Sequence, residues 1–157
     1  MDYLLGGALG ALSAFVFSFP AIVLEWTAGG KAEETPLVID VRSVFGIKLK
    51  RSEVFLVGLL VHIVVGFLFG STYVLLVEQG WHVFSDQPYS LFSFLMYALI
   101  SWVVVNLVFY PLLGMGWFAK KEGPNVWLET FVSHLLMGCA LWLLVQYYQP
   151  VYFMPSL

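Results

Sequence analysis

The sequence predicts an all-α membrane protein in which four transmembrane helices form two tandem hairpins with pseudo-twofold symmetry. Three observations predict this fold class. Of the 157 residues, 61% are hydrophobic and 11% are charged, and the mean hydropathy of +0.88 is far above the range of soluble domains. Four apolar stretches are long enough to cross a bilayer. The positively charged residues lie only in connections between those stretches.

The first predicted span covers about residues 4–26. No Lys or Arg precedes it, so it lacks the basic region of a signal peptide and should be a retained helix. Gly6 and Gly10 form a GxxxG pattern, which Ala14 extends by one turn. Small residues at this spacing let another helix approach closely. The span is therefore expected to pack against a second helix along this face.

The first connection is the one substantial polar segment, residues 27–52. Thr35 and Pro36 suit the cap and the first position of a helix, and Gly46 suits its end. Apolar residues between them fall on one helical face. We expect a short interfacial helix over about residues 36–45, lying on the membrane surface.

The second predicted span, about residues 54–77, contains one ionisable side chain, His62. An ionisable residue inside a span is a candidate functional residue. Gly58, His62, Gly66 and Gly70 repeat every four residues and therefore share one stripe of the helix. The glycines leave room beside the imidazole for a bulky group or for another helix.

The third and fourth predicted spans cover about residues 91–113 and 126–145. The third contains Asn106, which either bonds to another helix or lines a cavity. The fourth carries Glu129 and His134. The single domain thus comprises residues 1–157. It has one cysteine, Cys139 in the fourth span, which excludes an internal disulfide and fits an inert core residue.

The distribution of positive charge predicts the topology. The positive residues are Lys31, Arg42, Lys48, Lys50 and Arg51 in the first connection, and Lys120 and Lys121 in the third. The positive-inside rule places these connections in the cytoplasm and both termini on the other side. His62 follows Arg51 by eleven residues, and His134 follows Lys121 by thirteen. At 1.5 Å per residue, both histidines should lie ~16–20 Å from their cytoplasmic anchors, at nearly the same depth.

Two pairs of segments repeat the same order of features. The pairs are residues 14–26 with 105–117 and residues 62–70 with 134–142. In the first pair an aromatic residue precedes a proline and a tryptophan follows six residues after it; in the second a glycine follows a histidine by four. The matches predict two parallel hairpins related by an axis along the membrane normal. Spans two and four are then diagonal, so His62 and His134 can approach each other.

This pair of histidines supports one hypothesis with a cofactor. Two imidazoles at one depth can take both axial positions of a b-type haem, and Gly58, Gly66 and Gly138 would clear space for the ring. The only metal expected is then the haem iron, bound by His62 and His134. The propionates would pair with Arg42, Lys50 or Arg51. A chlorophyll-type pigment held by one histidine is a narrower variant.

Two other hypotheses need no cofactor. A proton relay or small transporter would use Glu129, His134 and His62, since histidine titrates near neutral pH. Alternatively, the histidines only satisfy hydrogen bonds with Thr130, Ser133 or a carbonyl, and the protein is an accessory or scaffold subunit. We expect this last role, in a larger membrane assembly with other subunits or further copies of the chain.

The sequence also argues against other function classes. It contains no GxSxG or HExxH motif, no phosphate-binding loop and no carboxylate cluster at metal-ligand spacing, so we do not expect an enzyme. No basic tract suggests a nucleic-acid partner. The expected partner is the lipid bilayer.

From His62 onward, the segments HIVVGFLFGSTYVLLVE, FYPLLGMG and WLETFVSHLL resemble the YagU-like group of small inner-membrane proteins. The resemblance covers roughly residues 54–142; the first span, its loop and the aromatic tail depart from the pattern. The shared positions are His62, Pro111, Gly114, Trp127, Glu129 and His134. The resemblance implies a multi-span protein of the bacterial inner membrane and little about chemistry.

Overall fold

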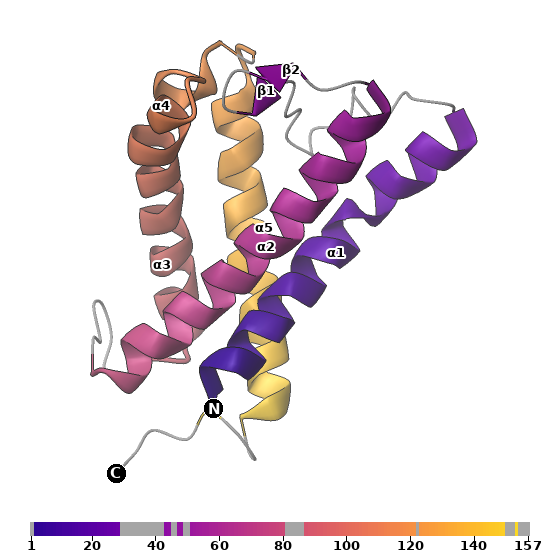
Figure 1. Ribbon diagram of the computed structural model, residues 1–157. Coiled ribbons are helices and arrows are strands. Elements are labelled where there is room, and N and C mark those ends of the chain that lie inside the picture. Colours follow the sequence, from indigo (N-terminus) through magenta and orange to yellow (C-terminus); the bar gives the residue numbers. More distant parts are fainter. Residues whose placement is uncertain are drawn as a thin grey trace.

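Four long helical segments make up the protein (Figure 1). The computed structural model describes residues 2–28, 43–44, 47–48, 51–80, 87–121, 123–149 and 153. The helical elements are α1 (Asp2–Ala28), α2 (Arg51–Glu78), α3 (Leu91–Val104), the π-helical turn η2 (Val105–Phe109), α4 (Tyr110–Leu112), the 3₁₀ turn η3 (Trp117–Ala119) and α5 (Val126–Tyr148). The third span is thus a composite of α3, η2 and α4.

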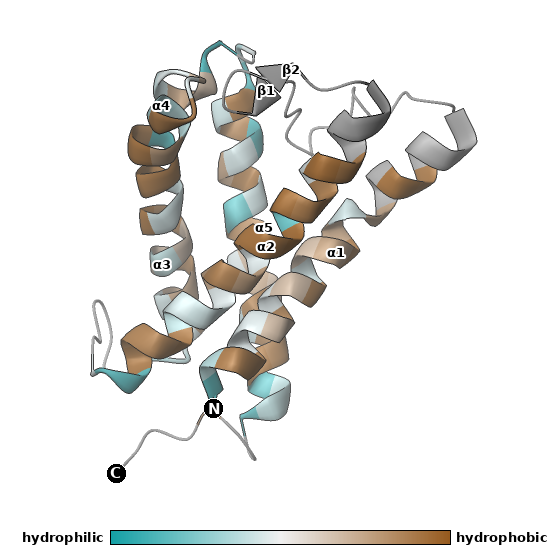
Figure 2. Cartoon of the chain, viewed as in Figure 1, coloured by the Kyte–Doolittle hydropathy of each residue, from teal (hydrophilic) through white to brown (hydrophobic). Residues whose placement is uncertain are grey.

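All four helical segments are long and apolar enough to cross a membrane. Figure 2 shows hydrophobic residues along the length of these helices, with hydrophilic residues near the ends and a few within α2 and α5. The helices extend a few residues beyond the predicted spans, 4–26, 54–77, 91–113 and 126–145, at most of their ends. The prediction of an all-α membrane protein with four spanning helices is confirmed.

The first connection contains a short antiparallel strand pair. β1 (Ser43–Val44) pairs with β2 (Ile47–Lys48), with Val44 opposite Ile47. Over Ser43–Val44 the predicted interfacial helix is wrong; residues 36–42 and 45 of that prediction lie outside the described residues. The sequence offers a reason, since a two-residue connection with glycine second, Phe45-Gly46, favours a hairpin.

The first hairpin is held by direct backbone contact. α1 and α2 lie side by side, inclined to the pair formed by α3 and α5 (Figure 1). Gly6 and Gly10 of α1 face Gly70 and Gly66 of α2. A Cβ atom on Gly70 would collide with the Gly6 carbonyl oxygen, and one on Gly10 with the Gly66 carbonyl oxygen. Both helices therefore carry a GxxxG face, and the two faces pack together.

The second hairpin is close-packed at a single glycine. A Cβ atom on Gly138 of α5 would lie 3.1 Å from Ala98 Cβ and 3.2 Å from the Phe94 carbonyl oxygen, both on α3. α1 also contacts α5, which joins the two hairpins on one side.

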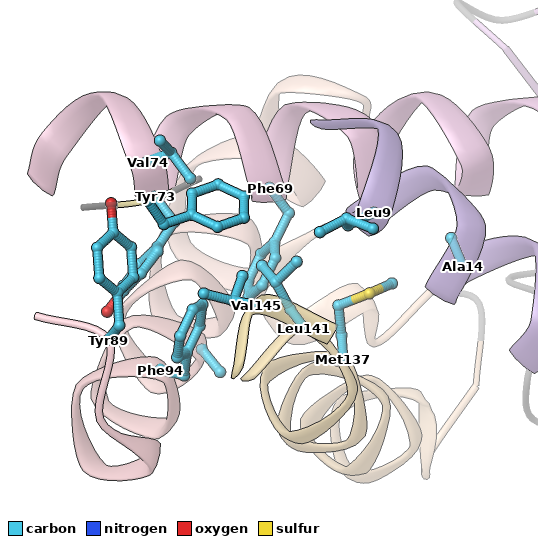
Figure 3. Close-up of a cluster of buried hydrophobic side chains, with 12 residues drawn as sticks. Leu9, Ala14, Phe69, Tyr73, Val74, Tyr89, Phe94, Met137, Leu141 and Val145 are labelled. Carbon is cyan, nitrogen blue, oxygen red and sulfur yellow. The ribbon is translucent and has the colours of Figure 1, made fainter. Parts of the chain in front are cut away.

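Aromatic side chains join the hairpins on the other side (Figure 3). The rings of Tyr73 (α2) and Phe94 (α3) stack with centroids 4.1 Å apart. The Phe69 and Tyr97 rings lie 4.7 Å apart, and the Tyr97 hydroxyl donates to the Phe69 carbonyl at 3.0 Å. Buried aliphatic side chains complete this core: Leu9, Met137, Leu141 and Val145. Large rings thus span the wider gap between α2 and α3.

Asp2 and Phe153 meet at the end of the bundle that carries the second connection. The backbone N–H of Phe153 donates to the Asp2 carboxylate at 3.1 Å, and its buried ring packs on Tyr89. Gln146 of α5 donates to the Tyr89 carbonyl at 2.8 Å. The termini and the second connection therefore share one end, as the charge distribution requires. Which side of the membrane this end faces stays a prediction.

Candidate functional site

His134 is held in one orientation by its own helix. Its Nδ1 lies 2.7 Å from the Thr130 carbonyl oxygen, one turn earlier in α5. Because a carbonyl can only accept a hydrogen bond, Nδ1 must carry the proton. In the neutral ring, Nε2 then keeps a free lone pair, which can accept a hydrogen bond or bind a metal.

α2 and α5 bring the two predicted histidines into the same part of the bundle. His62 is half-buried and lies close enough to His134 for the two rings to interact electrostatically. The Phe69 ring meets His134 edge-on, with centroids 6.4 Å apart. Phe69 lies two turns beyond His62 on α2, so an aromatic ring borders the imidazole pair on this side.

Neighbouring helices pack against the glycines near these histidines. A Cβ atom on Gly66 would lie 2.6 Å from Ala14 Cβ on α1, and one on Gly138 would lie 3.1 Å from Ala98 Cβ on α3. Gly58 is buried as well. The expectation that Gly66 and Gly138 clear space for a haem ring therefore gives way to a helix-packing role. The sequence also predicted that this glycine stripe of α2 packs against a second helix, and Gly66 and Gly70 do pack against α1.

Trp102 ties α3 to α5 beside His134. Its indole Nε1–H points at two acceptors on α5, the Trp127 carbonyl at 3.2 Å and Thr130 Oγ1 at 3.3 Å. Thr130 Oγ1 itself donates to the Trp127 carbonyl at 3.1 Å. Sequence reasoning missed this tryptophan. The available signal was an indole in mid-span, which needs an acceptor when it is buried in a bundle.

Asn106 lies in η2 and is fully buried. Its Nδ2 donates to the Trp102 carbonyl at 2.8 Å, so it bonds within its own segment rather than to another helix. Its Oδ1 has no hydrogen-bond partner in the part of the chain that the structure describes. The buried Tyr110 hydroxyl lies beside the Thr130 side chain and likewise makes no hydrogen bond of normal geometry among the described residues. A π-helical turn with unpaired polar groups is typical of functional sites.

Glu129 stands apart from the histidines. It lies in the first turn of α5, and no hydrogen bond or ion pair joins its carboxylate to His62 or His134 in the described ranges. Across the same ranges, no group of three or more His, Cys, Asp or Glu side chains is placed to hold a metal ion. The proposed propionate partners Arg42 and Lys50 lie outside the described residues, as does the Arg51 side chain.

Comparison with known proteins returns no match. No family model matches the chain, and neither a curated protein nor a solved structure does. The resemblance to the YagU-like group therefore stays a prediction that rests on the motifs alone.

Proposed function

We propose that this small integral membrane protein is an accessory or scaffold subunit of a larger membrane assembly and is not an enzyme. The observation that carries this proposal is the packing of its glycines. Gly66 and Gly138 each follow an intramembrane histidine by four residues, and at each of them a neighbouring helix occupies the space beside the glycine. The space beside these two glycines, which a substrate or ion would have to enter, is therefore occupied by contacts between helices.

The polar side chains near the histidines support the same role. His134 bonds to a carbonyl of its own helix, and Trp102 bridges α3 to α5. The Trp102 bond holds two helices together in lipid, where water cannot compete, and the His134 bond satisfies the ring within α5. The proton-relay alternative has no comparable support, because no hydrogen bond joins Glu129 to either histidine in the described ranges. We place the protein in a bacterial inner membrane with both termini on the non-cytoplasmic side, from its charges and its resemblance.

Mass measurement of the intact protein tests this role. The full chain, extracted from its native membrane in a mild detergent, should appear by native mass spectrometry in a complex of fixed stoichiometry. The mass should be well above the 17.7 kDa of one chain. A chain recovered only as a monomer, under conditions that keep other membrane complexes of the same cells intact, would contradict the proposal.

A second candidate function is b-type haem binding between His62 and His134. One observation favours it: the hydrogen bond to the Thr130 carbonyl uses Nδ1 of His134 and leaves the Nε2 lone pair for a ligand, while His62 on α2 is within electrostatic range of His134. Two neutral imidazoles are a suitable axial pair for haem iron, and a bound haem supplies one-electron redox chemistry. The donor atoms fit this group, whereas the filled space at Gly66 and Gly138 does not. To admit the ring at these glycines, α2 would have to move away from α1 and α5 away from α3.

An absorbance spectrum decides between the two functions. If haem is bound, protein purified after expression with haem supply should show a Soret band that disappears in His62→Ala and in His134→Ala. Cys139→Ala is the matched control, since Cys139 is also half-buried on α5 and should leave the band unchanged. A colourless wild-type protein that takes up no added hemin would rule out the haem site and leave the scaffold role standing.

A further inference from the structure

The turn before Pro111 has more backbone carbonyl acceptors than backbone N–H donors. Proline has no backbone N–H, so Pro111 cannot donate to a carbonyl of the preceding turn. The helix widens there into η2, in which the Tyr110 N–H bonds to the Val105 carbonyl five residues back. The Leu113 N–H bonds to the Phe109 carbonyl, so only the Leu112 N–H remains for the three carbonyls of residues 106–108, and two of these carbonyls have no backbone donor.

Two side chains add unpaired polar atoms at the same turn. Asn106 is 0% exposed, and its Nδ2 is fixed by the Trp102 carbonyl, so the free atom is the acceptor Oδ1. Tyr110 is 4% exposed, and its hydroxyl can both donate and accept. The two residues are four positions apart and so lie on the same side of this segment.

We propose that this turn is a binding site for an internal water molecule. The water donates one hydrogen to Asn106 Oδ1 and the other to one of the free backbone carbonyls, and it accepts the hydrogen of the Tyr110 hydroxyl. Three hydrogen bonds are typical of a buried water. Lipid cannot supply the missing donor within a spanning segment, and η2 lies in the last third of the span Leu91–Leu112, so the partner must be held inside the protein. Thr130 lies beside Tyr110, and its carbonyl holds His134, so the water site adjoins the histidine pair.

Water-edited solid-state NMR of the labelled full chain in lipid bilayers tests this site. Magnetisation should pass from water to the side-chain amide of Asn106. The backbone amide of Ser18 is the internal reference, because Ser18 is also fully buried and its hydroxyl is already bonded to the Ala14 carbonyl at 2.9 Å. No transfer to Asn106 in the folded wild-type protein would overturn the proposal without any variant.

Tyr110→Phe removes one partner of the water and keeps the ring, so the transfer to Asn106 should be lost. Tyr97→Phe is the matched control on α3, since the Tyr97 hydroxyl bonds to the Phe69 carbonyl away from η2, and it should leave the transfer unchanged. Unchanged transfer in Tyr110→Phe would show that the hydroxyl holds no water and would overturn the site as proposed.

Discussion

Phe94→Ala should lower the free energy of unfolding by about 3–5 kcal/mol, the range for removing a buried phenylalanine ring. Phe94 is 0% exposed and stacks on Tyr73 at 4.1 Å, in the contact that joins α2 to α3. Its carbonyl also faces Gly138 of α5. Loss of the ring leaves a cavity where the two hairpins meet, and lipid tails cannot reach that cavity to fill it.

Phe92→Ala is the matched control for this prediction. Phe92 lies two residues away on α3 and is 56% exposed, on a surface that faces lipid in a spanning helix. Its truncation should change stability little, since its ring is replaced by lipid of similar polarity. Reversible unfolding in mixed detergent, followed by circular dichroism, measures both variants. Equal losses for Phe92→Ala and Phe94→Ala would show that Phe94 does not join the hairpins.

The span positions could be predicted because bilayer thickness imposes a length on each apolar run. The packing of those spans was predictable only where small residues marked a face. Gly6 and Gly10 indicated such a face on α1, and Gly66 and Gly70 on α2. Apolar residues surround each helix, because lipid is as apolar as a protein core, so hydrophobic periodicity does not show which face packs. The ring contacts of Tyr73 and Phe94 were therefore missed.

The histidines of the candidate site could be predicted because ionisable residues in mid-span are costly and rare. That they lie at a similar depth was predicted from the number of residues between each histidine and the nearest preceding positive charge. The surrounding groups could not be predicted in the same way. The role of Trp102 depends on which residues of α5 face it, and the unpaired, buried acceptor of Asn106 lies in the widened turn before Pro111. Neither feature has a spacing signature in the sequence. The strand pair β1–β2 was missed because a Gly46 stop signal suits a helix end and a hairpin equally.

Gly70→Ala should destabilise the protein by about 1–3 kcal/mol, the usual cost of overpacking a well-packed interface. The new methyl group would collide with the Gly6 carbonyl oxygen, which is backbone and cannot turn aside. α1 and α2 would have to separate along their whole GxxxG contact. Alanine favours the helix by about 1 kcal/mol over glycine, which offsets part of this cost.

Gly138→Ala is the comparison variant for Gly70→Ala, because it adds the same methyl group at a less crowded glycine. Its methyl group would first meet Ala98 Cβ at 3.1 Å, a contact that a shift of a few tenths of an ångström between α5 and α3 relieves. The helix-propensity gain should then nearly balance the strain, so Gly138→Ala should stay close to wild type in the same unfolding assay. Both substitutions add one methyl group to a helical glycine, and the backbone atom nearest to Gly138, the Phe94 carbonyl oxygen, is only met at 3.2 Å. Their difference therefore measures the much closer backbone collision at Gly70. A Gly70→Ala protein as stable as Gly138→Ala would mean that α1 and α2 are not in backbone contact.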